Sequence, residues 1–258
     1  MFSAYFSRHS KIVGALMMRE TTTRFGRDGL GFLWVVGEPL LFCLFVLTMW
    51  SVIKPEYEHG IRIGPFVMTG YMSLLLLRHQ IGFSMYALQA NIGLLYHRRI
   101  TILHIFLARN LLEFSGGTAA FIVVYAILIA LGQVSLPESW LLVYSGWVLL
   151  GLMGNGTAII LAALSMRSDL MERLVPVLTY ALIPVSGAFF MVGWLPDRFR
   201  DAFLMIPFPN AIEMIRSGVF GEFVATYYHS AYAVGTAALL NLVGLLLLAS
   251  AKEFVDVE

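Results

Sequence analysis

Ionisable side chains in apolar surroundings are the residues of this sequence best placed to do chemistry. Arg78 and His79 lie in the second half of an apolar run over Ile63–Phe83, and Glu213 and Arg216 follow a proline-rich turn near the end of the chain. A charged group inside a bilayer usually faces the bundle interior or a water-filled path, where it pairs or contacts a substrate. A second interpretation of Arg78 stays open, because a long side chain near a helix end can also reach the membrane surface.

The sequence lacks the motifs of the common catalytic sites. It contains no G-x-x-x-x-G-K-[ST] phosphate loop, no H-E-x-x-H, no C-x-x-C and no G-x-S-x-G. The six histidines show no spacing that suits a metal ion, so we expect neither a catalytic residue nor a metal site. We therefore expect a transport protein driven by a partner. A membrane-embedded lipid-modifying enzyme is the alternative, and it would need polar or acidic residues clustered at one membrane depth.

The composition is that of a membrane protein. Hydrophobic residues make up 59% of the 258-residue chain and charged residues 13%, and the mean hydropathy is +0.80. A soluble domain carries about a quarter charged residues, because its surface faces water. Basic residues are scattered and form no stripe that could follow a phosphate backbone, so we expect the lipid bilayer and not nucleic acid as a partner.

Six apolar stretches are long enough to cross a bilayer, which requires about 20 residues in a helix. The sequence therefore predicts an all-α, polytopic membrane protein. Basic residues are more frequent in the segments that share a side with the termini, which favours cytoplasmic termini. The predicted spans are Phe32–Ile53, Ile63–Phe83, Phe114–Leu136, Trp140–Met166, Leu174–Leu195 and Ser230–Ala251.

Two segments outside the spans predict helices at the membrane surfaces. Residues 2–20 place apolar side chains at helical spacing with basic residues on another face, which predicts an amphipathic helix at the cytoplasmic interface. An ordinary soluble helix is the alternative. Between the fifth and sixth spans, Pro207 and Pro209 interrupt an apolar stretch that is too short to cross twice. We expect a re-entrant helical pair there, with a plain amphipathic surface loop as the alternative.

These segments predict a single membrane domain over residues 1–258. Residues 1–30 would form the cytoplasmic amphipathic segment, and 31–195 the first five spans. Residues 196–222 would form the outer re-entrant segment, and 223–258 the sixth span with a cytoplasmic tail.

Two polar segments connect spans on the expected cytoplasmic side. The first polar segment, residues 90–105, alternates polar and apolar residues at roughly helical spacing. In the second polar segment, residues 167–173, Ser168 could cap a helix with Glu172 in its first turn. Each segment is either a docking site for a cytoplasmic partner or a solvated turn.

Three motifs resemble the type-2 ABC exporter permeases. Arg24–Pro39 is similar to the start of their first membrane helix, and Gly187–Pro196 looks like their fifth helix entering an outer re-entrant region. Ile206–Arg216 resembles the segment before their sixth helix, although the order Pro-Phe-Pro-Asn departs from the Asn-Pro order common in the wider class. The resemblance covers nearly the whole chain and is greatest to the capsular-polysaccharide export permeases of Gram-negative bacteria.

The resemblance implies a homodimer with a central channel in the bacterial inner membrane. Two copies of a separate cytoplasmic ATP-binding subunit would hold ATP and magnesium, and this chain would hold no cofactor. A periplasmic partner of the polysaccharide co-polymerase type and an outer-membrane channel would complete the export path. The implied substrate is a capsular polysaccharide, which we expect to be lipid-linked. O-antigen, teichoic acid or a drug carried by the same class of permease are alternatives.

The resemblance also implies two groups of functional residues. Aromatic faces suit sugar rings, and arginine attracts an acidic glycan or a phosphate through charge-assisted hydrogen bonds. The expected substrate path and outer gate comprise Tyr71, Arg78, Tyr86, Phe208, Glu213 and Arg216. The expected elements of ATPase coupling comprise Asn91, Tyr96, Arg98, Arg99, Ser168, Asp169, Glu172 and Arg173.

Overall fold

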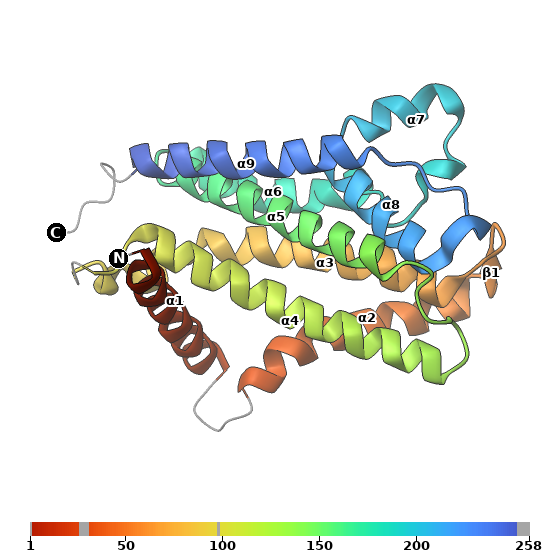
Figure 1. The fold of residues 1–258 in the computed structure, drawn as a ribbon, viewed down its shortest axis with the longest axis horizontal. Coiled ribbons are helices and arrows are strands. Elements are labelled where there is room, and N and C mark those ends of the chain that lie inside the picture. The colour runs from red at the N-terminus through yellow and green to blue at the C-terminus, as the bar shows by residue number, and fades with distance from the viewer. Residues whose placement is uncertain (1, 26–30, 97–98, 252–258) are drawn as a thin grey trace.

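The computed structural model describes residues 2–25, 31–96 and 99–251, in which long helices lie roughly side by side along one axis (Figure 1). In this described part of the chain, four helices are long and apolar enough to cross a membrane. The prediction of a mostly helical membrane protein is thus confirmed. These helices are α2 (Gly31–Ile53), α4 (Ile102–Ala130), α5 (Trp140–Ser165) and α9 (Ser230–Ala251).

Two further helices run within the bundle but do not meet that criterion. α3 (Ile63–Met85) contains Arg78 and has most of its residues buried against α4 and α5. α6 (Asp169–Val185) has 17 residues, with Pro176 and Pro184 inside it, and contacts α3 and α5. Length and hydropathy therefore support four of the six predicted spans, and the other two are helices of the bundle interior and its flank.

Two helices, α4 and α6, begin and end at other residues than the predicted spans Phe114–Leu136 and Leu174–Leu195. α4 begins at Ile102 and not at Phe114, because Thr101 caps it and the backbone N–H of Thr101 donates to His104 Nδ1 over 3.0 Å. α6 ends at Val185 and not at Leu195. Gly187, just beyond that end, has a φ of +76°, a left-handed conformation that glycine adopts without steric cost, and the chain turns there.

The helix expected at the start of the chain is present as α1 (Phe2–Phe25), inclined to the bundle (Figure 1). It packs against α4 and α2. Leu16, Glu20 and Thr21 are buried in these contacts. A buried carboxylate in this helix shows that α1 is attached to the bundle by polar contacts as well as apolar ones.

The two ends of the bundle differ in what they carry (Figure 1). α1 begins and α9 finishes at one end, which we call the termini end. The opposite end holds an antiparallel pair of two-residue strands, and we call it the hairpin end. The short elements are β1 (Tyr57–Glu58), β2 (Ile61–Arg62), η1 (Gln89–Leu94), η2 (Val192–Trp194), α7 (Asp197–Leu204), α8 (Pro207–Phe220) and η3 (Gly221–Phe223).

α5 occupies the centre and packs on α9, α8 and α3. Close approach depends on glycine: a Cβ at Gly146 would lie 2.9 Å from the carbonyl oxygen of Ala211 in α8, and one at Gly156 would lie 2.7 Å from the backbone of Leu240 in α9. Within the α5–α9 contact, Asn155 Nδ2 donates to Asn241 Oδ1 over 2.7 Å. This packing fixes α8 and α9 against the same central helix.

Candidate functional site

The two polar segments predicted to meet a cytoplasmic partner lie next to each other. η1 belongs to the first polar segment, and the start of α6 belongs to the second. Both line one cavity of about 350 Å³. We call this cavity the coupling pocket; its lining includes Gln89 and Ile92 of η1, Met166, and Asp169 and Glu172 of α6.

A buried polar cluster ties η1 to two other helices. Asn91 Nδ2 donates to Glu20 Oε1 of α1 over 2.6 Å and to the carbonyl oxygen of Ala87 over 2.8 Å. Asn91 Oδ1 accepts from the guanidinium of Arg19, and the other Glu20 oxygen pairs with Arg109 of α4. We call Arg19, Glu20, Asn91 and Arg109 the Glu20 cluster. Each oxygen of the buried Glu20 carboxylate thus has one donor, from Asn91 or from Arg109, and burying a charge is tolerated when it is paired and hydrogen-bonded in this way.

The other predicted coupling residues are mostly exposed. Asp169 and Glu172 lie in the first turn of α6, where their negative charge interacts favourably with the helix dipole. Ser168 is the N-cap residue, but its hydroxyl makes no capping hydrogen bond, so that detail of the prediction is wrong. Tyr96, Arg99 and Arg173 are exposed at the surface. Arg98 lies outside the described residues.

The predicted substrate-path residues on α3 divide into two places. Arg78 lies with its guanidinium carbon 5.0 Å from the ring centroid of Tyr180, which links α3 to α6. Tyr71, two turns away on the same face of α3, lies 6.3 Å from the ring of Phe189. Tyr86 follows the end of α3 and is exposed at the termini end. The structure therefore groups Tyr71 with Arg78 and leaves Tyr86 apart.

Arg216 and Glu213 on α8 are buried, with each side chain only 1% exposed. The Arg216 guanidinium donates to the carbonyl oxygens of Gly187, Ala188 and Phe190 over 2.8–3.0 Å and pairs with Glu213 over 3.1 Å. These carbonyls belong to the turn that follows α6. The pair thus holds the turn after α6 against α8.

We call the Arg216–Glu213 pair and its contacts with these carbonyl groups the Arg216–Glu213 lock. Glu213 adds two more contacts to it. Its carboxylate accepts from the backbone N–H of Val192 over 3.4 Å and from that of Tyr227 over 3.3 Å. Burial raises the pKa of the Glu213 carboxyl, and the Arg216 ion pair and the two backbone donors oppose that rise. In this conformation the pair positions the segment between α6 and α9 and offers no polar surface to a substrate. The neighbouring Phe208 is half-buried against the main core.

The sequence patterns did not predict a role for Glu20 or Arg109. The predicted span Phe114–Leu136 leaves Arg109 outside, whereas α4 begins at Ile102 and includes it. The signal was available in its surroundings, since Arg109 follows the apolar stretch Ile105–Ala108. An arginine flanked by such a stretch predicts a helix that buries the charge against a partner.

Comparison with known proteins agrees with the motifs. The model of the ABC-2 type transporter family matches residues 12–220. The chain is 34% identical to the capsule polysaccharide export inner-membrane protein CtrC of Neisseria meningitidis serogroup B, over 95% of this chain and 93% of that protein. It is 31% identical to BexB of Haemophilus influenzae, of the same description, over 99% of this chain and 96% of that protein.

A more distant relative is the polysialic acid transport protein KpsM of Escherichia coli. The identity is 25%, over 93% of each chain. These matches extend across the Glu20 cluster, the coupling pocket and the outer segment alike. The resemblance predicted from the motifs is therefore confirmed, and this chain belongs to the ABC-2 type transporter family.

Proposed function

We propose that this chain is the membrane-spanning subunit of an ATP-driven exporter that moves capsular polysaccharide from the cytoplasm to the periplasm. The observation that carries the proposal is its similarity, over nearly the full length, to relatives described as capsule polysaccharide export inner-membrane proteins. The coupling pocket at one end of the bundle is consistent with a subunit that receives its energy from a partner.

In this proposal the chain is one permease domain with six spans in the bacterial inner membrane: α2, α3, α4, α5, α6 and α9. Both termini are cytoplasmic, so the termini end faces the cytoplasm and the hairpin end faces the periplasm. α7 and α8 form the outer re-entrant pair. Their support is that Arg216, Glu213 and Asn210 of α8 satisfy backbone groups of the neighbouring turns, as a non-spanning segment within a membrane requires.

The cytoplasmic partner is an ATP-binding subunit that holds ATP and magnesium. It would dock over the coupling pocket and contact Tyr96, Arg98 and Arg99 from one side and Asp169 and Arg173 from the other. Asn91 lies buried behind this surface and contacts Glu20 of α1. A displacement of η1 would therefore move α1 and α4 through the Glu20 cluster, because those helices share its hydrogen bonds.

The chain acts as a homodimer around a central channel. The support is the apolar surface of α2, where only 11% of the spanning window is buried, and of α6, which exposes Tyr180 and Val177. A large exposed apolar face is in contact with either lipid or a partner protein. The path of a lipid-linked polysaccharide would then pass Tyr71 and Arg78 on α3. A periplasmic co-polymerase-type protein and an outer-membrane channel would carry the polymer onward.

The proposal is tested by searching the genes next to this one for a protein with a G-x-x-x-x-G-K-[ST] phosphate loop and co-expressing that ATP-binding protein with this chain. We expect a stable complex in detergent whose ATPase activity falls in the Asp169→Asn/Glu172→Gln variant. Glu56→Gln, an exposed carboxylate at the hairpin end, is the matched control and should leave the activity unchanged. A deletion strain should accumulate capsular polymer inside the cell.

Two results would contradict the proposal. One is the absence of any complex with the ATP-binding protein. The other is unchanged surface capsule in the deletion strain. Accumulation of O-antigen, teichoic acid or a drug in that strain would keep the export mechanism and replace the substrate.

A further inference from the structure

A histidine of α1 and a histidine of α4 meet at the termini end, near the starts of both helices (Figure 1). His9 Nδ1 lies 2.6 Å from His104 Nε2, and the two rings are stacked with their centroids 4.9 Å apart. His104 is buried and His9 is half-buried. Neither histidine belongs to the Glu20 cluster or lines the coupling pocket. The contact is therefore a second, separate attachment of α1 to the bundle.

A hydrogen bond from the backbone fixes the position of the proton on each imidazole. The backbone N–H of Thr101 donates to His104 Nδ1 over 3.0 Å, and a backbone N–H can only donate. His104 Nδ1 is therefore the acceptor nitrogen of a neutral ring, whose proton is on Nε2. That Nε2–H donates to His9 Nδ1, so His9 Nδ1 is an unprotonated acceptor as well. This pattern of hydrogen bonds requires both imidazoles to be neutral.

Each added proton costs one of these hydrogen bonds. A proton on His104 Nδ1 would face the N–H of Thr101 at the first turn of α4, where the helix dipole also disfavours positive charge. A proton on His9 Nδ1 would face the N–H of His104, so that two donors meet without an acceptor. A second proton would leave two stacked cations in contact. Protonation therefore weakens the contact between α1 and α4.

The described charged groups nearest to the pair in the sequence are cationic. Arg8 and Lys11 flank His9 on α1, and Arg99 precedes α4; these three side chains line one cavity of about 500 Å³. The carboxylate between the same two helices is Glu20, which is paired with Arg109. Like charge from the neighbouring cations therefore opposes protonation of the attached pair.

The other elements packed on the start of α4 contribute apolar side chains. Ile102 and Ile105 lie in one buried cluster with residues of α5 and α9. The charged side chains near the ends of those helices are engaged elsewhere or face another site. Arg167 bonds the hydroxyl of Ser250, and the carboxylates of α6 line the coupling pocket. The pair of histidines is thus the titrating contact between α1 and the start of α4.

We propose that His9 and His104 form a pH-sensitive latch, which holds the start of α1 on α4 when both rings are neutral and releases it on acidification. A free imidazole binds its proton near pH 6.5. The attached state binds fewer protons than the released state, so a fall in pH favours release. The latch is closed above about pH 7 and opens as the pH falls through about 6. This inference goes beyond the proposed export function and does not depend on it.

Release would change how α1 is held and not detach it. Glu20 lies about 16 Å beyond His9 along the helix, at about 1.5 Å per residue. With the latch open, α1 stays attached through the Glu20 cluster, and its first turns are free to move away from α4. The movement expected is therefore largest at the start of α1.

The test is a distance measurement by double electron–electron resonance on the full chain in lipid nanodiscs. Spin labels at Ser10→Cys of α1 and Leu170→Cys of α6 occupy exposed positions, and Cys43 is fully buried, so it stays unlabelled. Dilution with unlabelled chain leaves one labelled copy in each assembly. We expect one narrow distance at about pH 7.5 and an additional, broader component at about pH 5.5. The ratio of released to attached α1 should rise at least about tenfold, the factor that one freely titrating imidazole gives over this range.

Two variants separate the latch from other titrating groups. His9→Gln/His104→Gln keeps side-chain acceptors that do not titrate, and glutamine at this position of a capping box accepts from the backbone N–H before the helix as His104 does. Its distance distribution should be the same at both pH values. His9→Ala removes the contact, so the released component should be present already at the higher pH.

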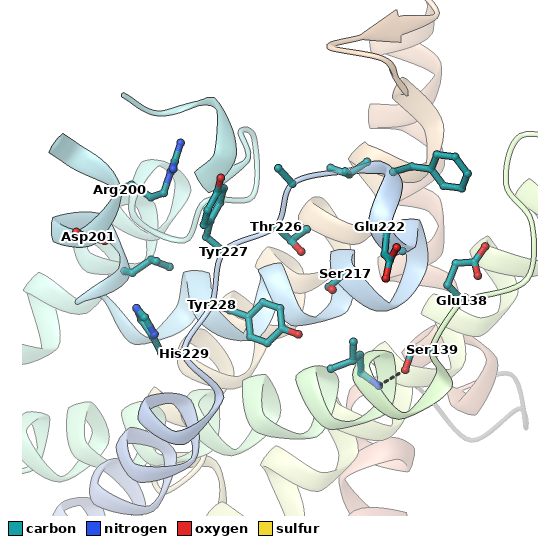
Figure 2. Close-up of a pocket in the computed structure, with 16 residues that line it drawn as sticks. Glu138, Ser139, Arg200, Asp201, Ser217, Glu222, Thr226, Tyr227, Tyr228 and His229 are labelled. Carbon is teal, nitrogen blue, oxygen red and sulfur yellow. Dashed lines mark hydrogen bonds between the residues drawn. The ribbon is translucent and has the colours of Figure 1, made fainter. Parts of the chain in front are cut away.

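The matched control is His229→Gln, which removes a histidine at the hairpin end. His229 is exposed in the segment that leads into α9, where it lines an open hollow together with Asp201 and Tyr228 (Figure 2). This variant should respond to pH as the parent does. Thermal unfolding of every variant, measured in parallel at the higher pH, establishes that it folds. If the double variant does not fold, His9→Gln alone takes its place and should show a weaker response to pH than the parent.

Three results would overturn the latch. These are a distance distribution of the parent that does not change with pH, an undiminished pH response in the glutamine variants, and a His9→Ala distribution equal to that of the parent at the higher pH. The export function is judged separately, because this measurement uses no nucleotide, partner protein or polysaccharide.

A consequence for coupling rests on the proposed function. α1 contacts η1 through Glu20 and Asn91, so release of its start would loosen a helix that borders the docking surface. ATPase activity of the complex should then fall more on acidification in the parent than in His9→Gln/His104→Gln. Equal falls would show that the latch does not act on coupling.

Discussion

Glu20 of α1 and Arg109 of α4 form an ion pair in which both side chains are about nine-tenths buried. The pair connects a helix near the start of the chain to the central bundle, and the same carboxylate accepts from Asn91 of η1. If the proposed partner displaces η1, the movement would therefore reach α1 and α4 through one carboxylate.

Removal of one member of this pair should be costly. Arg109→Met leaves Glu20 buried with a single remaining donor, and breaking a buried pair costs about 3–5 kcal/mol. We expect a clear fall in the thermal unfolding temperature in detergent. The double variant Glu20→Gln/Arg109→Met should recover part of the loss, because it removes both charges. A double variant that is as unstable as the sum of the two single variants would show that the residues do not interact.

Asn91→Ala tests the connection between η1 and the rest of the cluster. The substitution removes two donated hydrogen bonds and leaves Glu20 with fewer donors, for a cost of about 1–3 kcal/mol. We expect ATPase stimulation in the complex to fall more than stability does. Ile92→Ala, an exposed neighbour in η1, is the comparison for a change in the docking surface alone. If stability and ATPase stimulation fell equally, the role of Asn91 would be structural and not one in coupling.

The Arg216–Glu213 lock should be essential for folding of the segment between α6 and α9. Arg216→Met leaves a buried carboxylate and three carbonyl oxygens without their donor, and we expect about 3–5 kcal/mol of destabilisation. The measurement is the yield of monodisperse protein in detergent together with its thermal unfolding. Arg198→Met, an exposed arginine of the same outer segment, is the control and should be neutral. Normal yield and stability of Arg216→Met would argue against the lock.

Gly70→Ala should disrupt the contact of α3 with the turn after α6. Its Cβ would lie 1.9 Å from the carbonyl oxygen of Ala188, a backbone atom that cannot rotate away. Gly82→Ala in the same helix meets no atom within 4 Å, so it should be neutral or stabilise the helix by up to about 1 kcal/mol. Thermal unfolding of the two variants, compared side by side, measures the steric cost alone. Equal stability would contradict the close approach.

Arg78→Gln examines the contact between α3 and Tyr180 of α6. A cation–π contact contributes about 0.5–2 kcal/mol, so stability should change little. We expect export of polysaccharide to fall nonetheless, because the proposed path loses its cation. Tyr180→Phe keeps the aromatic face and should keep export. Full export by Arg78→Gln would assign the arginine to helix packing.

The sequence by itself determined the class of protein, most of its helices and its family. Apolar runs such as Trp140–Met166 form helices in a bilayer whatever their neighbours are, because the backbone must satisfy its own hydrogen bonds there. The motifs Arg24–Pro39 and Ile206–Arg216 predicted the family from order and spacing alone. The sequence did not predict that the two polar segments lie next to each other, because no local pattern places residue 92 beside residue 169.

Only the tertiary structure decided the pairing of charges and the shape of the cavities. The sequence placed Glu213 and Arg216 one turn apart on a helix, but the carbonyl oxygens that Arg216 binds lie 26–29 residues earlier in the chain. Glu20 and Arg109 are 89 residues apart, and neither carries a local signal of its partner. Periodicity and hydropathy describe neighbours along the chain, whereas burial of a charge depends on groups that folding brings together.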